Sequence, residues 1–462
     1  MTSTRRSSHG PKGHPGHHPR RPASPPAGRG TVPGARRALV LLAVFSIISF
    51  GDKAVLGLAG PRMIEDLGLT NAQFGLIGSA FYLLFSVSAF VTGLVNGRFR
   101  ATWLLAGMAI VWSAAQLPVL VPAAGFAVLV VTRVLLGAGE GPGLPMANHV
   151  AFTWFRPEQR TTASGVISMG GALGVIVGGP ILAGVIAAFG WRWAFGVLGV
   201  VGLVWTAVWR AVGGEGPYGV DEDEGRTPPR EPGAPAPKAL PLRRIAGRPT
   251  FLLCVVAGFA AQWTLGIATA WLPTFLEHAA GYSTGEVGFL VGIPSLVAIA
   301  AVLGLVAGQR RLRARGRSRR ATYRVLGLLA SLPPGLLLIG ITTGVEGVAL
   351  LLCVAVAFGS GVAVGPLIAA TLADVVPVAS RGLTLCVAVA VTSLGAVASP
   401  WVTGRLLDLA ATEAAGFDWA FRLNGALVLL GGLLLLLVDP DRDNARLRAA
   451  SSTQAARDGG PP

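Results

Sequence analysis

The sequence predicts an all-α integral membrane protein with twelve transmembrane helices in two six-helix repeats. Of its 462 residues, 52% are hydrophobic, 64 are glycine and only 13% are charged, whereas about 25% of the residues in soluble domains are charged. A membrane-spanning helix needs about 20 mostly apolar residues, so this composition can supply roughly a dozen of them. The mean hydropathy of +0.62 agrees, and together these values exclude an ordinary cytosolic enzyme.

Apolar stretches of spanning length recur along the whole chain in two sets of six. The first set lies at about 38–59, 74–95, 101–121, 125–148, 162–188 and 191–212. The second set lies at about 249–275, 285–308, 321–341, 346–370, 381–403 and 417–438. The segment between the sets is rich in Pro and Gly and holds six acids against six bases, which is typical of a linker.

The pattern divides the chain into five parts. We expect a disordered basic tail at 1–37, an N-terminal six-helix bundle at 38–212, a linker at 213–248, a C-terminal six-helix bundle at 249–438 and a second tail at 439–462. The first tail is rich in Pro, Gly, Ser and His, and such a composition cannot bury enough apolar surface to fold.

The formal net charge of +16 is concentrated beside apolar stretches. Residues 1–37 hold eight Lys and Arg residues and no acid, and residues 309–320 hold seven arginines. Lys and Arg beside a membrane span favour the cytoplasmic side. The charge excess therefore predicts topology and no nucleic-acid partner: a multi-pass protein of the cell membrane with both termini and the linker in the cytoplasm.

The two sets of spans contain similar sequence segments that are separated by a constant number of residues. Gly-Leu-Val-Asn-Gly-Arg-Phe-Arg at 93–100 and Gly-Leu-Val-Ala-Gly-Gln-Arg-Arg at 304–311 lie 211 residues apart, and the same offset carries the start of the first span onto the start of the seventh. Two parallel six-helix repeats are the arrangement of major facilitator superfamily transporters, in which substrate binds between the halves at mid-depth.

The segment 93–100 resembles the loop between the second and third helices of that superfamily. By this resemblance Gly93, Gly97, Arg98 and Arg100 belong to a loop that takes part in conformational change. Asn96 stands where the superfamily usually has Asp. In the alternative interpretation the two arginines serve topology only.

Four ionisable side chains fall inside the apolar stretches of the first half: Asp52, Lys53, Arg133 and Glu140. Charge at membrane depth is costly, so such residues are candidates for function. With a helical rise of 1.5 Å per residue, Asp52 lies about 21 Å up through a core of about 30 Å, and Arg133 and Glu140 lie about 12 and 22 Å down from the opposite face. The sequence therefore predicts two acids and two bases in one cavity, with no net charge.

Two interpretations of these four residues stay open. In the first, they form a site for an anion and protons. In the second, Asp52 with Arg133 and Lys53 with Glu140 are permanent ion pairs that hold two helices together.

Glu140 lies in a segment rich in Gly and Pro, from Gly137 to Pro145. Proline removes a backbone donor and glycine weakens a helix, so the segment predicts a bend. The candidate hinge residues are Gly139, Gly141, Pro142 and Pro145. The alternative reading of the glycines is tight packing of neighbouring helices.

Several segments together resemble the anion/cation symporter family of the superfamily, which includes sialin and bacterial sugar-acid and phthalate permeases. The matching segments are Asp52-Lys53, 66–75, Arg133-x6-Glu140 and 154–165, with weaker matches at 271–275, 374–382 and Pro400. The resemblance implies proton-coupled symport, that is uptake, of a small organic anion by alternating access. It further implies that Asp52 and Glu140 are the proton sites and that Lys53 holds the substrate carboxylate.

The chain departs from this family at several positions that face the substrate. Phe50 and Phe85 replace tyrosines of the sugar-acid carriers, Gly171 replaces a Gln, Ala369 a Trp, and Ser393 lies near an Asn position. A polyhydroxylated substrate needs many buried hydrogen-bond partners, so these changes favour a less hydroxylated organic acid, such as an aromatic acid. The candidate substrate-binding residues are Lys53, Arg133, Phe50, Phe85 and Ser393.

Two alternative functions stay open. The stretch Gly179-Pro180-Ile-Leu-Ala183-Gly184 partly resembles the Gly-Pro-x-x-Gly-Gly signature of proton-driven drug antiporters, which would make the protein an efflux carrier. A membrane sensor that keeps the fold without transport is the candidate from another class.

We expect no enzymatic activity, because the chain lacks a Ser/His/Asp constellation, an HExxH site and a phosphate-binding Gly-Lys-Ser/Thr loop. The three cysteines lie in apolar stretches, which indicates neither a disulfide nor a metal site. We therefore expect no cofactor, a proton gradient as the energy source, and a monomer whose partners are a small organic anion, protons and the lipid bilayer.

Overall fold

The computed structural model describes residues 32–95, 100–218, 247–376, 378–439 and 442–443. The predicted tails fall almost entirely outside these residues, as does the part of the predicted linker from 219 to 246. Every regular element in the described residues is helical.

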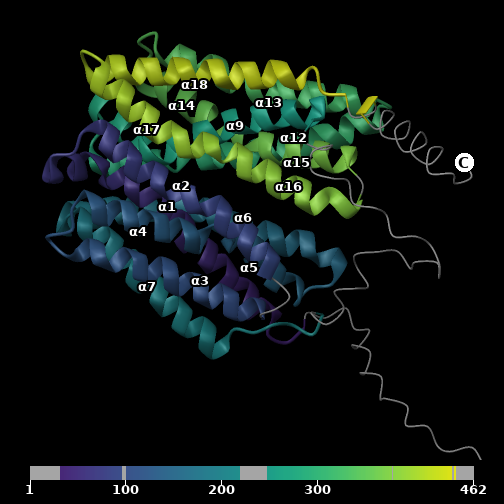
Figure 1. The fold of residues 1–462 in the computed structure, drawn as a ribbon, viewed down its shortest axis with the longest axis horizontal. Helices are drawn as coiled ribbons and strands as arrows, with labels where there is room; N and C mark the ends of the chain where they lie inside the picture. Colours follow the sequence, from purple (N-terminus) through teal and green to yellow (C-terminus); the bar gives the residue numbers. More distant parts are fainter. Residues whose placement is uncertain (1–31, 96–99, 219–246, 377, 440–441, 444–462) are drawn as a thin grey trace, which may run out of the picture. The chain divides into compact units, whose positions relative to one another are not determined.

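The N-terminal half contains the first six predicted spans (Figure 1). Its helices are α1 (Ala35–Leu67), α2 (Asn71–Val95), α3 (Ala101–Gln116) with the 3-10 turn Leu117–Leu120, α4 (Phe126–Glu140), α5 (Gly143–Phe152), α6 (Pro157–Phe189) and α7 (Trp191–Val212).

The C-terminal half contains the other six spans, several of which are interrupted. Its elements are α9 (Pro249–Ala270), α10 (Leu272–Thr274), the π-helix Phe275–Ala279, α11 (Thr284–Leu290), α12 (Ile293–Ala314), α13 (Arg319–Ile341), α14 (Gly347–Gly359), the 3-10 turn Ser360–Ala363, α15 (Val364–Val375), α16 (Val378–Thr392), α17 (Leu394–Leu409) and α18 (Glu413–Leu435).

The predicted membrane fold is confirmed. Within the described residues, eleven helical segments are long and apolar enough to cross a bilayer. The remaining predicted span, 74–95, lies in the 25-residue helix α2.

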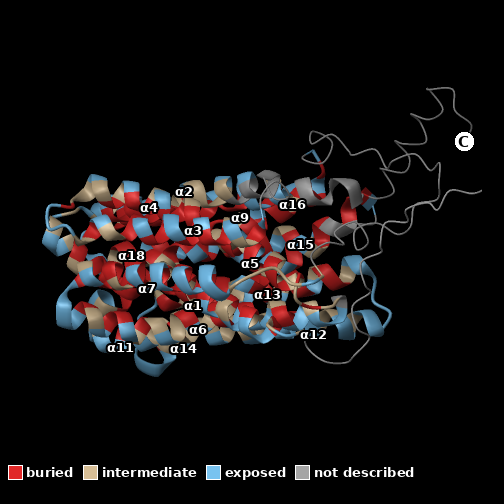
Figure 2. Ribbon diagram, turned by 90° about the horizontal axis from the view of Figure 1, so that it is seen from below, coloured by how far each residue is buried: buried red, intermediate tan, exposed pale blue. Residues whose placement is uncertain are grey.

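Apolar side chains cover much of the outside of the helices as well as the interior. Figure 2 shows buried positions on the inward sides of the helices and exposed positions on their outer sides. Large apolar residues such as Leu303, Val348 and Phe189 are 65 to 74% exposed. Exposure of so many apolar side chains to water would be unfavourable, whereas lipid tails are as apolar as these side chains. The outer surface therefore suits a lipid bilayer.

The two halves meet mainly through α2 with α17 and α6 with α11. Glycine makes the first contact close: a Cβ on Gly75 would lie 2.2 Å from the Pro400 carbonyl oxygen, and a Cβ on Gly404 would lie 2.2 Å from that of Asn71. A larger residue at either position would force the two helices apart.

Polar contacts join the halves at the end of the bundle where α1 finishes. Arg62 on α1 donates to Thr284 at 2.6 Å and pairs with Glu277 at 3.4 Å. The Asp408 carboxylate of α17 accepts the backbone N–H groups of Asn71 and Ala72, each at 2.9 Å. We call this set of six residues the latch.

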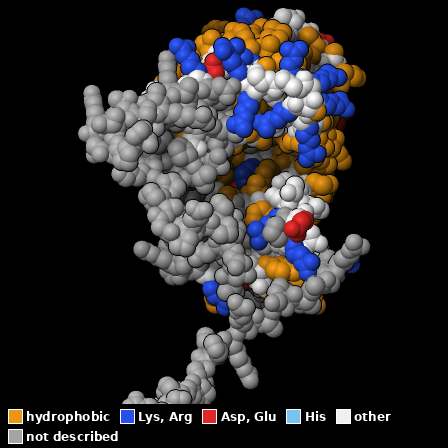
Figure 3. All heavy atoms as spheres, turned by 90° about the vertical axis from the view of Figure 1, so that its right-hand side faces the viewer, with side chains coloured by type: hydrophobic (Ala, Val, Ile, Leu, Met, Phe, Trp, Pro, Cys, Tyr) orange, Lys and Arg blue, Asp and Glu red, His pale blue; other side chains and the backbone are white. Residues whose placement is uncertain are grey.

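The opposite end of the bundle, where α1 begins, faces the viewer in Figure 3. Lys and Arg side chains gather on its upper part, and the surface is hollowed near the centre of the face. The exposed arginines between α12 and α13 belong to this end. The described molecule is thus fastened at one end and hollowed at the other.

Candidate functional site

The four predicted ionisable residues lie together inside the N-terminal half. Asp52 and Lys53 come from the middle of α1, and Arg133 and Glu140 come from α4, two turns apart on one face. Asp52, Glu140 and Arg133 are 0, 2 and 4% exposed. Asp52 lies close enough to the other three residues to interact electrostatically with each.

Lys53 and Glu140 form an ion pair. The Lys53 ammonium also donates to the hydroxyl and carbonyl oxygens of Ser49, at 3.0 and 3.2 Å, and the Ser49 hydroxyl donates to Glu140 Oε2 at 3.2 Å. The Glu140 side chain is fully buried, whereas the Lys53 side chain is 15% exposed. Lys53 is therefore the member of the ion pair that reaches toward solvent.

Asp52 is held by Gln116, a residue that the sequence analysis did not single out. Gln116 at the end of α3 is 2% exposed, and its amide Nε2 donates to Asp52 Oδ1 at 3.0 Å. Within the described residues, the second Asp52 oxygen and Gln116 Oε1 have no hydrogen-bond partner. The sequence could have indicated this residue, because Gln116 places a polar amide inside the apolar stretch 101–121.

Arg133 forms no ion pair within the part of the chain that the structure describes. Its guanidinium lies over the Phe195 ring, 4.7 Å from the centroid, and its buried Nη2 lacks a hydrogen-bond partner among the described residues. Of the two ion pairs in the alternative interpretation, the structure contains Lys53–Glu140, whose permanence stays a prediction, while Gln116 takes the place expected for Arg133 beside Asp52.

Both bases line a small cavity. Lys53, Leu56, Gly78, Phe81, Tyr82, Arg133 and Thr269 line it. Thr269 belongs to α9, and its hydroxyl lies 3.0 Å from the Tyr82 hydroxyl. The cavity therefore borders both halves of the molecule.

Aromatic rings surround the Lys53 ammonium. Its Nζ lies 4.9 Å from the centroid of the Phe50 ring, 5.7 Å from that of Phe81 and 5.8 Å from that of Phe85. The structure thus brings the predicted Phe50 and Phe85 to Lys53 and adds Phe81. Ser393 is buried between α16 and α17, where its hydroxyl donates to the Val389 carbonyl at 2.6 Å; its role in binding stays a prediction.

The helix is broken beside Glu140, where the sequence predicts a bend. α4 ends at Glu140 and α5 begins at Gly143, with Pro142 as its N-cap. The glycines also serve packing, because a Cβ on Gly141 would lie 1.9 Å from the Phe85 carbonyl oxygen and one on Gly139 would lie 3.0 Å from the Trp112 nitrogen. Movement about this break, including Pro145, stays a prediction.

The loop between α2 and α3 is described only at its edges. Gly93 lies in the last turn of α2, and Gly97 and Arg98 lie outside the described residues. Arg100 is the N-cap of α3 and pairs with Glu215 at 3.7 Å. Glu215 lies just after α7, so this contact ties the start of the predicted linker to the loop.

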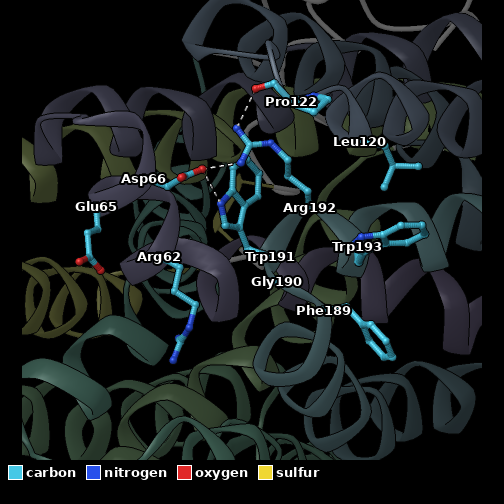
Figure 4. A pocket seen from close by; sticks show the side chains of 10 residues that line it. All are labelled: Arg62, Glu65, Asp66, Leu120, Pro122, Phe189, Gly190, Trp191, Arg192 and Trp193. Atoms are coloured by element: carbon cyan, nitrogen blue, oxygen red, sulfur yellow. Dashed lines mark hydrogen bonds and ion pairs between the residues drawn. The ribbon is translucent and has the colours of Figure 1, made fainter.

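A larger cavity, of about 660 Å³, lies at the fastened end (Figure 4). There Asp66 pairs with Arg192 and accepts the indole N–H of Trp191 at 3.1 Å, and Arg192 also donates to the Pro122 carbonyl at 3.3 Å. Asp66 and Arg192 thus neutralise each other, although Arg192 Nε has no hydrogen-bond partner among the described residues.

The partial antiporter signature has a packing explanation. A Cβ on Gly179 of α6 would lie 2.3 Å from the Gly288 carbonyl oxygen of α11. Glycine at this position therefore permits the close contact between the halves.

Comparison with known proteins agrees with the fold. The sequence model of the Major Facilitator Superfamily matches residues 42–400. The chain resembles solved structures of a bacterial homologue of the human lysosomal transporter Spinster (TM-score 0.71, 17% identity, 90% of this chain and 98% of that one) and of a D-xylose–proton symporter (TM-score 0.68, 15% identity, 87% and 97%). These likenesses show the fold.

The curated relatives include carriers of organic anions. The hexuronate transporter of Bacillus subtilis is 30% identical over 58% of this chain and 62% of its own length. The D-galactonate transporter of Escherichia coli is 28% identical over 88% of this chain and 97% of its own, and the probable sulfoacetate transporter of Cupriavidus necator is 26% identical over 87% and 93%.

The expected resemblance to anion/cation symporter-like carriers is therefore confirmed by these relatives. With a family match over most of its length and a helical membrane fold of two halves, the chain belongs to the major facilitator superfamily of membrane transporters.

Proposed function

We propose that the protein is a secondary transporter that takes up a small organic anion, most simply a carboxylate, together with protons by alternating access. The relatives named above carry hexuronate, D-galactonate and, by its name, sulfoacetate. The charged cluster of α1 and α4 is the site this proposal requires. The proposal also places both termini of the protein in the cytoplasm, because Lys and Arg beside the membrane spans favour that side.

The observation that carries the proposal is the Lys53–Glu140 ion pair beside an Arg133 without a salt bridge among the described residues. In this arrangement the empty site is electrically neutral, because two buried acids balance two bases. A carboxylate that binds both bases would add one uncompensated negative charge in a region of low dielectric. Proton uptake by an acid cancels that charge, so anion and proton stabilise each other's binding.

Glu140 is the acid best placed for this exchange. When its carboxylate is protonated, its attraction for the Lys53 ammonium is reduced to that of a neutral hydrogen-bonding group. The ammonium is then free to pair with the incoming carboxylate. Release of the proton on the far side restores the Lys53–Glu140 pair and expels the anion.

The latch supplies the structural element that alternates. In the described conformation Arg62 and Asp408 fasten the halves at one end, and the cavity beside Lys53 borders residues of both halves. Rocking of one half against the other opens the latch and closes the hollowed end. Coupling requires only that anion and proton favour the same conformation.

Uptake into proteoliposomes tests the proposal. The purified protein is reconstituted, a panel of radiolabelled carboxylates is supplied outside, and a pH gradient is imposed. We expect acid outside to accelerate accumulation and a protonophore to stop it, with protein-free liposomes as the control. Outward movement of a cationic or neutral drug against a proton gradient would instead establish the antiporter, and binding without movement of any carboxylate would establish the sensor.

A further inference from the structure

The side chains around Lys53 indicate which kind of anion the site accepts. Phe50 comes from α1, and Phe81, Tyr82 and Phe85 come from one face of α2. The three rings of α2 form a connected group, because the Phe81 centroid lies 4.9 Å from that of Tyr82 and 5.5 Å from that of Phe85, and the Phe50 ring lies beside the same Lys53 ammonium. We call these four residues the ring wall.

The ring wall borders accessible space. Phe50 and Phe85 are only partly buried, and the Lys53 side chain between them is 15% exposed. Phe50 is also fixed from behind, since a Cβ on Gly171 of α6 would lie 2.9 Å from its ring. The absence of a side chain at Gly171 therefore sets the position of an aromatic face beside the ammonium.

Hydroxyl groups near the bases are already engaged. The Tyr82 hydroxyl pairs with that of Thr269 at 3.0 Å, and the Ser49 hydroxyl donates to Glu140 at 3.2 Å. A polyhydroxylated acid brings several donors and acceptors that each need a partner when water is removed, and an unpaired one costs binding free energy. The ring wall presents aromatic faces at the positions where a polyhydroxylated acid would need hydrogen-bond partners.

We infer that the anion is a small aromatic carboxylate whose carboxylate binds Lys53 and Arg133 and whose ring packs against Phe50, Phe81 and Phe85. Aromatic rings pack favourably in offset and edge-to-face contacts. The ammonium that faces the rings in the empty site pairs with the carboxylate in the loaded one. This inference rests on the proposed function, because it names the substrate class of the same site.

Three carboxylates separate the contributions of the ring and of the hydroxyl groups. Benzoate has the carboxylate and an aromatic ring, cyclohexanecarboxylate has the carboxylate and a saturated ring, and gluconate has the carboxylate and five hydroxyl groups. We expect saturable, pH-driven uptake of benzoate into proteoliposomes, with uptake of cyclohexanecarboxylate about tenfold lower and gluconate lower still.

Variants of the ring wall connect this preference to the residues. Phe50→Leu and Phe85→Leu keep an apolar side chain and remove the ring, so benzoate uptake should fall about tenfold, while Phe85→Tyr retains it. Phe289→Leu is the matched control, because Phe289 is 67% exposed on α11. Thermal unfolding of each purified variant, with and without benzoate, shows whether the variant is folded and whether it still binds.

The outcomes distinguish this inference from the proposed function. Proton-driven uptake of gluconate in preference to benzoate, or equal uptake of benzoate and cyclohexanecarboxylate, would overturn the aromatic substrate and leave organic-anion symport intact. Folded Leu variants with unchanged benzoate uptake would overturn the role of the ring wall. Failure of every carboxylate in the wider panel would remove the proposed function and this inference together.

Discussion

At the scale of single residues, the site depends on which acid holds which base. Glu140 holds Lys53, with Ser49 bridging them, and Asp52 is held by the neutral amide of Gln116. Because Gln116 and not Arg133 holds Asp52, the guanidinium of Arg133 remains available to an anion.

Glu140→Gln imitates the protonated acid permanently. We expect this variant to lose proton-driven accumulation and to keep exchange of labelled for unlabelled substrate across the membrane, because Lys53 is released but no proton can leave. Counterflow and net uptake, measured on the same proteoliposomes, check this.

A purely structural ion pair predicts a different result for this variant. Removal of one buried partner would then cost about 3 to 5 kcal/mol, and exchange would fail together with accumulation. Thermal unfolding in detergent distinguishes the two cases. A well-folded Glu140→Gln protein that still concentrates substrate would exclude Glu140 from the proton path.

Lys53 is expected to act through its charge. Lys53→Gln should abolish uptake without loss of folding, since the amide cannot neutralise a carboxylate, whereas Lys53→Arg should keep part of the activity. Binding of the substrate by isothermal titration checks the cause. Normal uptake by the Gln variant would contradict the assignment.

Gln116 is expected to stabilise Asp52. A hydrogen bond to a buried charged group contributes about 1.5 to 3 kcal/mol, so Gln116→Leu should lower the free energy of unfolding by about that amount. In an Asp52→Asn background the same substitution should cost much less. Additive losses in this double-mutant cycle would show that the two side chains act independently.

Residue identity alone predicted part of this site. The cost of charge in a membrane pointed to all four ionisable residues, and they do lie together. Of the two ion pairs in the alternative interpretation, Lys53 with Glu140 is present and Asp52 with Arg133 is not, because helical spacing fixes height and face but not the rotation of one helix against another. Gln116 was missed since an uncharged amide is a weak signal, although burial gives it a specific partner.

At the scale of elements, proline and glycine determine where the helices break and how closely they pack. The break predicted beside Glu140 is present at Pro142. The helix of the predicted span 249–275 is interrupted after Ala270. Pro273 lacks the N–H that would bond to the Thr269 carbonyl, and that carbonyl lies 2.6 Å from a Cβ placed on Gly57 of α1. Mean apolarity along a stretch does not reveal such a break.

The free backbone N–H groups at the N-terminus of α2 donate to an acceptor in the other half of the molecule, Asp408 of α17. Asp408 accepts two backbone N–H groups there, as an N-cap residue does within a helix. Asp408→Ala should therefore weaken the latch and expose Ser79, which is 4% exposed and accepts the Trp401 N–H across the halves at 3.2 Å.

Labelling of a single cysteine measures this exposure. In a background without native cysteines, Ser79→Cys should react with a maleimide about two- to tenfold faster when Asp408 is replaced by Ala. Glu346→Ala is the matched control, because Glu346 is an exposed acid on the turn before α14. Equal rates in the two variants would show that Asp408 does not fasten the halves.

At the scale of the whole molecule, the repeat predicted two halves but not how they are fastened. The offset of 211 residues places Pro273 opposite Arg62, so the latch has no counterpart at that position of the second half. An internal repeat carries information about what the halves share. The contacts that hold one end shut depend on residues in which they differ, and therefore emerge only from the structure.

The latch also has a consequence for the sidedness of inhibition. An acid too bulky to be enclosed could approach Lys53 only through the hollowed end, and once seated it would prevent the halves from rocking. Such a compound would lock the described conformation from one face of the membrane, whereas from the other face it could reach Lys53 only after the latch has opened. Right-side-out and inverted vesicles treated with the same impermeant acid would therefore respond differently, and the more responsive face would identify the compartment that the described conformation serves.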